Sequence, residues 1–120
     1  MRTRWASRSA PVGYLTITNK AVIREANLTI SALLGVGRRD LINDRFRKYI
    51  APEDPECRDR HFLAVLRSGE KCTCDLRLRK SDGSLLYARL ESIRTESAHE
   101  DPVIRTAISD ITHKNVQKKN

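Results

Sequence analysis

Apolar and polar residues alternate most regularly between positions 72 and 79, and this alternation predicts a β-strand. One face of that strand would carry Cys72, Cys74, Leu76 and Leu78, and the other Thr73, Asp75, Arg77 and Arg79. Because only the first set is apolar, we expect it to face a core and the second set to face solvent.

Similar patterns predict four further strands along the chain. The expected strands span residues 13–18, 21–26, 72–79, 86–90 and 103–111. In the fourth strand the apolar face carries Leu86, Ala88 and Leu90, and Asp82-Gly83 favours a turn just before it.

Three segments between the second and third strands have the spacing and end signals of helices. Asn27 can cap a short helix that stops at Gly35. Residues 37–50 are rich in charge, with apolar residues at helical spacing, which indicates one or two short helices. Pro52-Glu53-Asp54 predicts the start of a longer helix, which ends at Ser68-Gly69. The fold class is therefore α+β: a five-stranded antiparallel sheet with helices inserted between strands 2 and 3.

Length and charge limit the class of protein. The 120 residues suffice for one domain, which we place at 12–112, between a basic arm at 1–11 and the start of an exit helix at 113–120. The net charge of +8 is spread along the chain without a basic helix that carries interleaved aromatic residues, so we expect no nucleic-acid partner. The chain has neither an apolar run of about 20 residues nor the apolar centre of a signal peptide, so we expect a cytoplasmic domain without direct membrane insertion.

Five short motifs occur in a particular order along the chain. They are Asn27 with Leu33-Leu34-Gly35, Pro52-Glu53-Asp54, Ser68-Gly69-Glu70, Asp82-Gly83-Ser84 and Asp110-Ile111-Thr112. With this order and spacing, the chain resembles the PAS sensory-domain family over residues 13–112. The resemblance implies a curved sheet and helices around a small pocket, and a signal that passes through the last strand into an exit helix. Such domains are commonly dimers linked to histidine kinases, cyclic-dinucleotide enzymes or transcription regulators.

The resemblance assigns the signal relay to Asp110 and Thr112. Thr112 can cap a helix beginning at His113, and Asp110 can hold the end of the strand through charge-assisted hydrogen bonds. The simpler alternative is a strand end and a helix cap with no role in signalling.

Two cofactors of PAS relatives fit this sequence poorly, and the cofactor is left unknown. The flavin-adduct motif aligns with Asn43-Asp44-Arg45-Phe46, where Asp44 occupies the position of the nucleophilic cysteine. The positions that hydrogen-bond the flavin ring align with Leu78, Ala88 and Ile108, which have no polar side-chain atoms. The haem-ligating histidine aligns with Arg58, one turn from His61.

Sulfur and imidazole ligands form a weak candidate for a metal or redox site. Cys57 and His61 share a helix face, and Cys72 and Cys74 share a strand face. We favour core packing for the two strand cysteines, because they continue the apolar face of Leu76 and Leu78.

The remaining prediction is an apolar pocket, filled either by its own side chains or by a small organic ligand. The expected walls are Phe46, Tyr49, Phe62, Leu66, Leu76, Leu78, Ala88, Leu90 and Ile108. A ligand pocket also needs a few converging polar groups, for which Asn27, His61 and Thr106 are the candidates.

No catalytic motif is recognisable, so we expect a module that is not an enzyme. Three hypotheses remain: a sensor that controls a linked output domain, an interaction-only dimerisation domain with a filled core, and a basic nucleic-acid binder. We expect a homodimer, formed through the N-terminal arm with Trp5 or through the outward sheet face. That face carries Thr73, Arg77, Tyr87 and Arg89.

Overall fold

The computed structural model describes residues 12–51, 55–96 and 101–112, without the side chains of 55–58. Its elements follow the predicted order of two strands, helices and three strands. They are β1 (Gly13–Thr18), β2 (Ile23–Ala26), α1 (Leu28–Leu34), α2 (Arg38–Leu41), the 3-10 helix η1 (Phe46–Tyr49), α3 (Pro55–Ser68), β3 (Cys72–Arg79), β4 (Leu85–Thr95) and β5 (Val103–Asp110). The predicted arm, the exit helix and the helix start at 52–54 lie outside the described residues.

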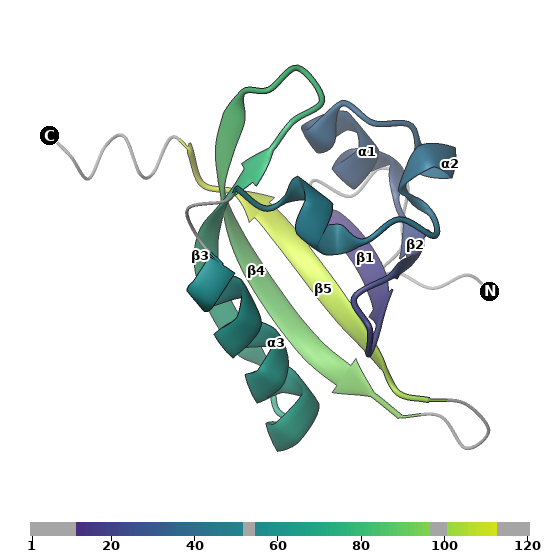
Figure 1. Cartoon of the computed structure of the whole chain (residues 1–120), viewed down its shortest axis with the longest axis vertical. Coiled ribbons are helices and arrows are strands. Elements are labelled where there is room, and N and C mark those ends of the chain that lie inside the picture. The colour runs from purple at the N-terminus through teal and green to yellow at the C-terminus, as the bar shows by residue number, and fades with distance from the viewer. Residues whose placement is uncertain (1–11, 52–54, 97–100, 113–120) are drawn as a thin grey trace, which may run out of the picture.

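The five strands form one antiparallel sheet in the order β2-β1-β5-β4-β3 (Figure 1). The first and last strands therefore pair in the middle of the sheet, with Leu15 opposite Thr106. This arrangement confirms the predicted α+β fold and places the end of the chain's last strand beside β4.

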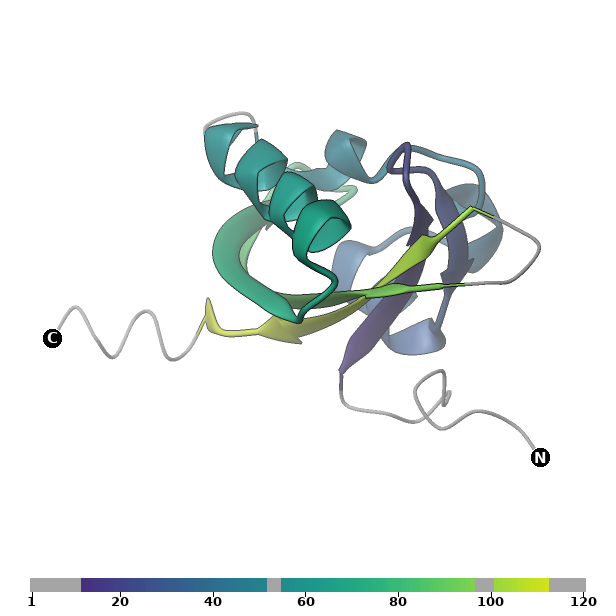
Figure 2. The ribbon, with the colours of Figure 1, turned by 90° about the horizontal axis from the view of Figure 1, so that it is seen from below.

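Alternation along the strands separates the two faces of the sheet, as predicted. Leu86, Ala88 and Leu90 of β4 are almost fully buried, whereas Tyr87 and Arg89 between them are only partly buried. The buried residues face the helices: α3 packs along β3 and β4, and α1 packs against β1 (Figures 1 and 2). The core thus lies between one face of the sheet and these helices.

Both ends of α1 confirm the sequence prediction. The Asn27 side-chain oxygen accepts the Ile30 amide at 3.0 Å, and Gly35 adopts a left-handed conformation with φ of 71°. The same oxygen of Asn27 also accepts the Tyr14 amide at 3.0 Å, so the cap fixes α1 to β1. Gly69, which follows α3, is left-handed as well, with φ of 72°.

The second strand begins two residues later than predicted. Ala21 has a φ of 67°, which interrupts extended backbone, and the predicted strand at 21–26 is reduced to Ile23–Ala26. The backbone of Ile23 bonds to Asn43 and Asp44, so the loop after α2 covers this edge of the sheet. No helix within the described ranges is long and apolar enough to cross a membrane.

Candidate functional site

The predicted pocket walls come together in the core. Phe46, Leu78, Ala88, Leu90 and Ile108 have no exposed surface, and they belong to one cluster of contacting side chains. The other predicted walls lie at its edge: Tyr49 and Leu76 are buried, and Phe62 and Leu66 are half-buried against the cluster. The Phe46 and Phe62 rings meet edge to face, with centroids 6.1 Å apart.

A chain of three polar side chains crosses this apolar core. His61 Nε2 lies 2.8 Å from Ser92 Oγ, and Ser92 Oγ lies 2.8 Å from Thr106 Oγ1. His61 is 5% exposed, while Ser92 and Thr106 are fully buried. The chain joins α3 to β4 and β4 to β5, so the helix and the two strands share one hydrogen-bond network.

The chemistry of this network favours a neutral imidazole. Burial lowers the pKa of His61, because the surrounding apolar groups cannot solvate an imidazolium. A neutral ring has one donor and one acceptor nitrogen, and each hydroxyl can donate and accept, so the chain can be satisfied in either direction. Within the described residues, every buried side-chain nitrogen and oxygen has a hydrogen-bond partner.

The polar candidates from the sequence therefore divide into two sets. His61 and Thr106 are brought together through Ser92, which the sequence prediction missed. Asn27 instead serves the helix cap and donates from its amide nitrogen to the Val12 carbonyl at 3.1 Å. Ser92 could have been found from the alternation of β4, since it is the next inward position after Leu90.

The end of β5 is fastened to β4. The Asp110 carboxylate accepts the Thr112 amide at 2.9 Å, and the Thr112 hydroxyl accepts the Tyr87 amide at 3.2 Å. The Ile111 amide donates to the Tyr87 carbonyl at 2.9 Å. Asp110 thus bonds within the turn that follows β5, and the Thr112 hydroxyl bonds to β4. The helix that Thr112 was expected to cap lies outside the described residues.

The segment that aligns with the flavin-adduct motif carries a polar network on its outer side. Asp44 accepts hydrogen bonds from the Tyr49 hydroxyl at 2.7 Å and from Lys48 Nζ at 3.1 Å. The Tyr49 bond, followed by Lys48, holds the pKa of Asp44 below its usual value. Burial is the main cause that raises the pKa of Tyr49, and the hydrogen bond to the Asp44 carboxylate is the second. At neutral pH Tyr49 is therefore a phenol and Asp44 a carboxylate.

Among the described residues, Cys72, Cys74 and His61 do not come together as a set of metal ligands. There, no group of three His, Cys, Asp or Glu side chains lies close enough to hold a metal ion. Cys72 donates to the Glu70 carbonyl, and both Cys72 and Cys74 pack against the core from the edge. The side chain of Cys57 lies outside the description, as does that of Arg58, so the four-ligand set stays untested.

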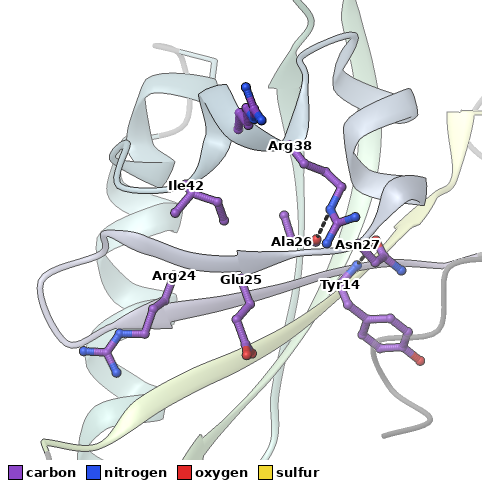
Figure 3. Close-up of a pocket in the computed structure, with 8 residues that line it drawn as sticks. Tyr14, Arg24, Glu25, Ala26, Asn27, Arg38 and Ile42 are labelled. Carbon is purple, nitrogen blue, oxygen red and sulfur yellow. Dashed lines mark hydrogen bonds between the residues drawn. The ribbon is translucent and has the colours of Figure 1, made fainter. Parts of the chain in front are cut away.

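A surface cleft of about 420 Å³ lies between β2 and α2. Figure 3 shows Arg38 reaching from α2 to the end of β2, where its Nε donates to the Ala26 carbonyl at 2.9 Å. Arg24 and Glu25 project from the strand on the opposite side from Ile42 (Figure 3). The Arg38 bond satisfies a carbonyl at the sheet edge, which gives this side chain a structural role.

The outward face of the sheet is polar with a few apolar side chains. Arg89 and Asp75 form an exposed ion pair, with Arg89 Nε 2.9 Å from Asp75 Oδ1. Arg77 and Tyr87 lie opposite each other in the register and are half-buried. Ile93 on the same face of β4 is 42% exposed. Trp5, the alternative dimer contact, lies outside the described residues.

The fold and the buried polar chain define a small α+β domain whose helices close over one face of an antiparallel sheet. The family model of the PAS domain matches residues 11–113. The chain belongs to the PAS-domain family, as its sequence motifs predicted. Among curated proteins, no relative matches the sequence.

Solved PAS domains share this fold at low sequence identity. One from a Colwellia psychrerythraea protein is 18% identical, with a TM-score of 0.81 over 91% of this chain and 93% of that one. One from a LuxR-family transcriptional regulator of Burkholderia thailandensis, in complex with ethanol, is 18% identical, with a TM-score of 0.74 over 92% and 98%. One from a two-component sensor histidine kinase is 13% identical, with a TM-score of 0.73 over 86% and 87%.

Proposed function

We propose that this PAS domain is a sensory module that detects a small ligand or a change of state and relays it through β5 to a linked output domain. The output would be a histidine kinase, a cyclic-dinucleotide enzyme or a transcription regulator. The similar domains from a sensor kinase and a transcriptional regulator support this class of output. The module itself would act without catalysis, in the cytoplasm.

The observation that carries the proposal is the His61–Ser92–Thr106 chain. It begins on α3 and ends on β5, four residues before Asp110. A ligand that competes for one of these hydroxyls, or a shift of α3, would change hydrogen bonds that β5 shares. The strand end is in turn bonded to Thr112 and through it to β4, so a change at Thr106 can reach the exit segment within one strand.

The test is an amide NMR titration of the full chain with a library of small organic molecules. A sensor predicts that compounds shifting the Ser92 and Thr106 amides also shift those of Tyr87 and Thr112. The Ser92→Ala variant should retain the shifts near the ligand and lose those at Thr112. Shifts that stay confined to the core in the wild-type protein would contradict the relay.

A second candidate function is supported by the packing of the core. The predicted walls Phe46, Leu78, Ala88, Leu90 and Ile108 have no exposed surface and belong to one cluster of buried side chains, which supports a filled interior. An interaction-only dimerisation domain requires a filled core and no ligand cavity. Native mass spectrometry distinguishes the two candidates: a retained extra mass favours the sensor, and a bare dimer with no library hits favours the interaction domain.

A homodimer through the outward sheet face is part of both candidates. The half-buried Arg77 and Tyr87 and the exposed Ile93 would lie at its centre. Sedimentation should show a dimer that Tyr87→Glu weakens. A strict monomer at high concentration would contradict this arrangement for the isolated chain.

A further inference from the structure

Helix α3 has a second apolar strip, which does not face the sheet. His61 and Val65 point toward the core, whereas Phe62, Leu63 and Leu66 line a surface groove of about 420 Å³. The groove runs between α3, the β1–β2 turn and the segment that enters η1. Leu63 is 49% exposed there and shares the groove with Phe62 and Leu66, and such an apolar patch is more informative than an exposed leucine that stands alone.

Positive charge borders this apolar strip. Lys20, Arg45 and Arg47 line the groove, and among the described residues that line it the one acid is Asp59. The side chains of Lys20, Arg45 and Arg47 make no hydrogen bond or ion pair with the described residues. Their neighbour Lys48 differs, since it is paired with Asp44. The groove therefore combines an apolar floor with cations that are available to an anion.

We infer that this groove binds the anion of a single-chain fatty acid. The alkyl chain would lie on Phe62, Leu63 and Leu66, and the carboxylate would meet Arg45 and Arg47. An inorganic anion would leave the apolar strip in water, and a neutral hydrocarbon would leave the cations unmatched, so an amphiphile satisfies both halves. The inference deepens the proposed function by naming a ligand class. It rests on that function only for the effect of binding on β5, and not for binding itself.

The floor of the groove also contacts the core. Phe62 meets the fully buried Phe46 edge to face, and its ring lies 5.3 Å from that of His61, centroid to centroid. A ligand on Phe62 would therefore touch a neighbour of the polar chain. The groove is a different site from the apolar core pocket predicted from the sequence, and the two sites share only Phe62 and Leu66.

The experiment is isothermal titration of the full chain with octanoate, decanoate and dodecanoate, and with decanol as the uncharged probe. Full burial of a methylene would tighten binding about fourfold, and an open groove should give about twofold to fourfold per methylene. Decanoate should bind more tightly than decanol, and added salt should narrow that difference. Amide shifts should centre on residues 19–21, 45–47 and 59–66.

Two matched pairs of variants locate the site. Leu63→Glu should weaken decanoate at least about tenfold, whereas Leu85→Glu, the same change at a leucine that is 43% exposed outside the groove, should not. Arg45→Gln should weaken decanoate but not decanol, and Arg79→Gln should affect neither.

Three results would overturn the inference. They are no saturable binding of any of the acids, equal weakening by the groove and control variants, and amide shifts centred on Ser92 and Thr106 in place of the groove. None of them decides whether β5 relays a signal, because the relay is tested separately by the Ser92→Ala titration. Conversely, saturable binding at the groove with no shift at Ser92, Thr106 or Thr112 would support the site and show that binding there is not coupled to β5.

Discussion

Replacing Ser92 with alanine is the most direct test of the buried polar chain. Ser92 is its middle member, so the substitution removes the partner of His61 Nε2 and the partner of Thr106 Oγ1 together. Ser92 and Thr106 are fully buried and His61 is 5% exposed, so water cannot readily replace the lost hydroxyl. The loss is therefore larger than that of one hydrogen bond.

The expected magnitude comes from two groups left without partners. Each buried unsatisfied donor or acceptor costs about 1–3 kcal/mol, so the two groups together predict that Ser92→Ala lowers the free energy of unfolding by about 2–6 kcal/mol. Thr106→Val removes only the end of the chain and leaves Ser92 bonded to His61, so it should cost about 1 kcal/mol. The double variant should cost less than the sum of the two single variants, because both act on the same bond.

Urea unfolding followed by circular dichroism measures these differences. With an m-value of about 2 kcal/mol/M, Ser92→Ala should lower the urea midpoint by roughly 1–3 M without changing the slope. Ser109→Ala is the matched control, because Ser109 lies on β5 but points to the outward face, and it should stay within about 0.5 kcal/mol of the wild type. If Ser92→Ala were as mild as this control, the chain would not be the structural link that the relay requires.

Three further predictions concern single groups. The free energy of unfolding should fall as the pH is lowered from about 7.5 to about 5.5. Because the pKa of His61 is lowered in the folded state, the unfolded chain binds a proton at this histidine below about pH 6.5 while the folded chain does not. The loss from His61 is at most about 1.4 kcal/mol per pH unit. His61→Gln should flatten that profile, and an unchanged slope would contradict burial of the neutral ring. Asn27→Ala should cost about 1–3 kcal/mol in urea unfolding, since it removes the helix cap and the partner of the Tyr14 amide, and a loss below about 0.5 kcal/mol would count against both bonds. Arg89→Ala should leave the urea midpoint unchanged, because its ion pair with Asp75 is exposed to solvent, and a clear loss of stability would show that this pair is not merely a surface contact.

The fold could be predicted because its elements are encoded locally. Period-2 alternation identifies the inward face of β3 and β4 from Leu76, Leu78, Leu86 and Ala88 without knowledge of any partner strand. The caps of α1 are equally local, since an asparagine and a left-handed glycine each act within one turn. The late start of β2 was missed because it depends on the left-handed Ala21, where the sequence gives no glycine signal.

The site was less predictable because it depends on distant parts of the chain. His61 and Thr106 could be named as polar residues near the core, but the contact between them needs Ser92 from a third element. The groove combines residues from the β1–β2 turn, the start of η1 with the residue before it, and α3, and no sequence period connects these segments. Charge that is spread evenly along a chain can therefore still be concentrated at one place in the fold.

The buried polar chain and the surface groove share helix α3, so a ligand in the groove can act on the polar chain through this helix. Phe62 and Leu66 face the groove while His61 faces the sheet, so a ligand on the helix would act on α3 as a body. The two hydrogen bonds of the polar chain are both 2.8 Å long and weaken steeply once donor and acceptor separate beyond about 3.5 Å. A shift of α3 by less than about 1 Å would therefore break the hydrogen bond between His61 and Ser92. The Ser92 hydroxyl would then bond only to Thr106. A discrete change of partner, rather than gradual deformation of a packed core, is the kind of response that a two-state sensor requires.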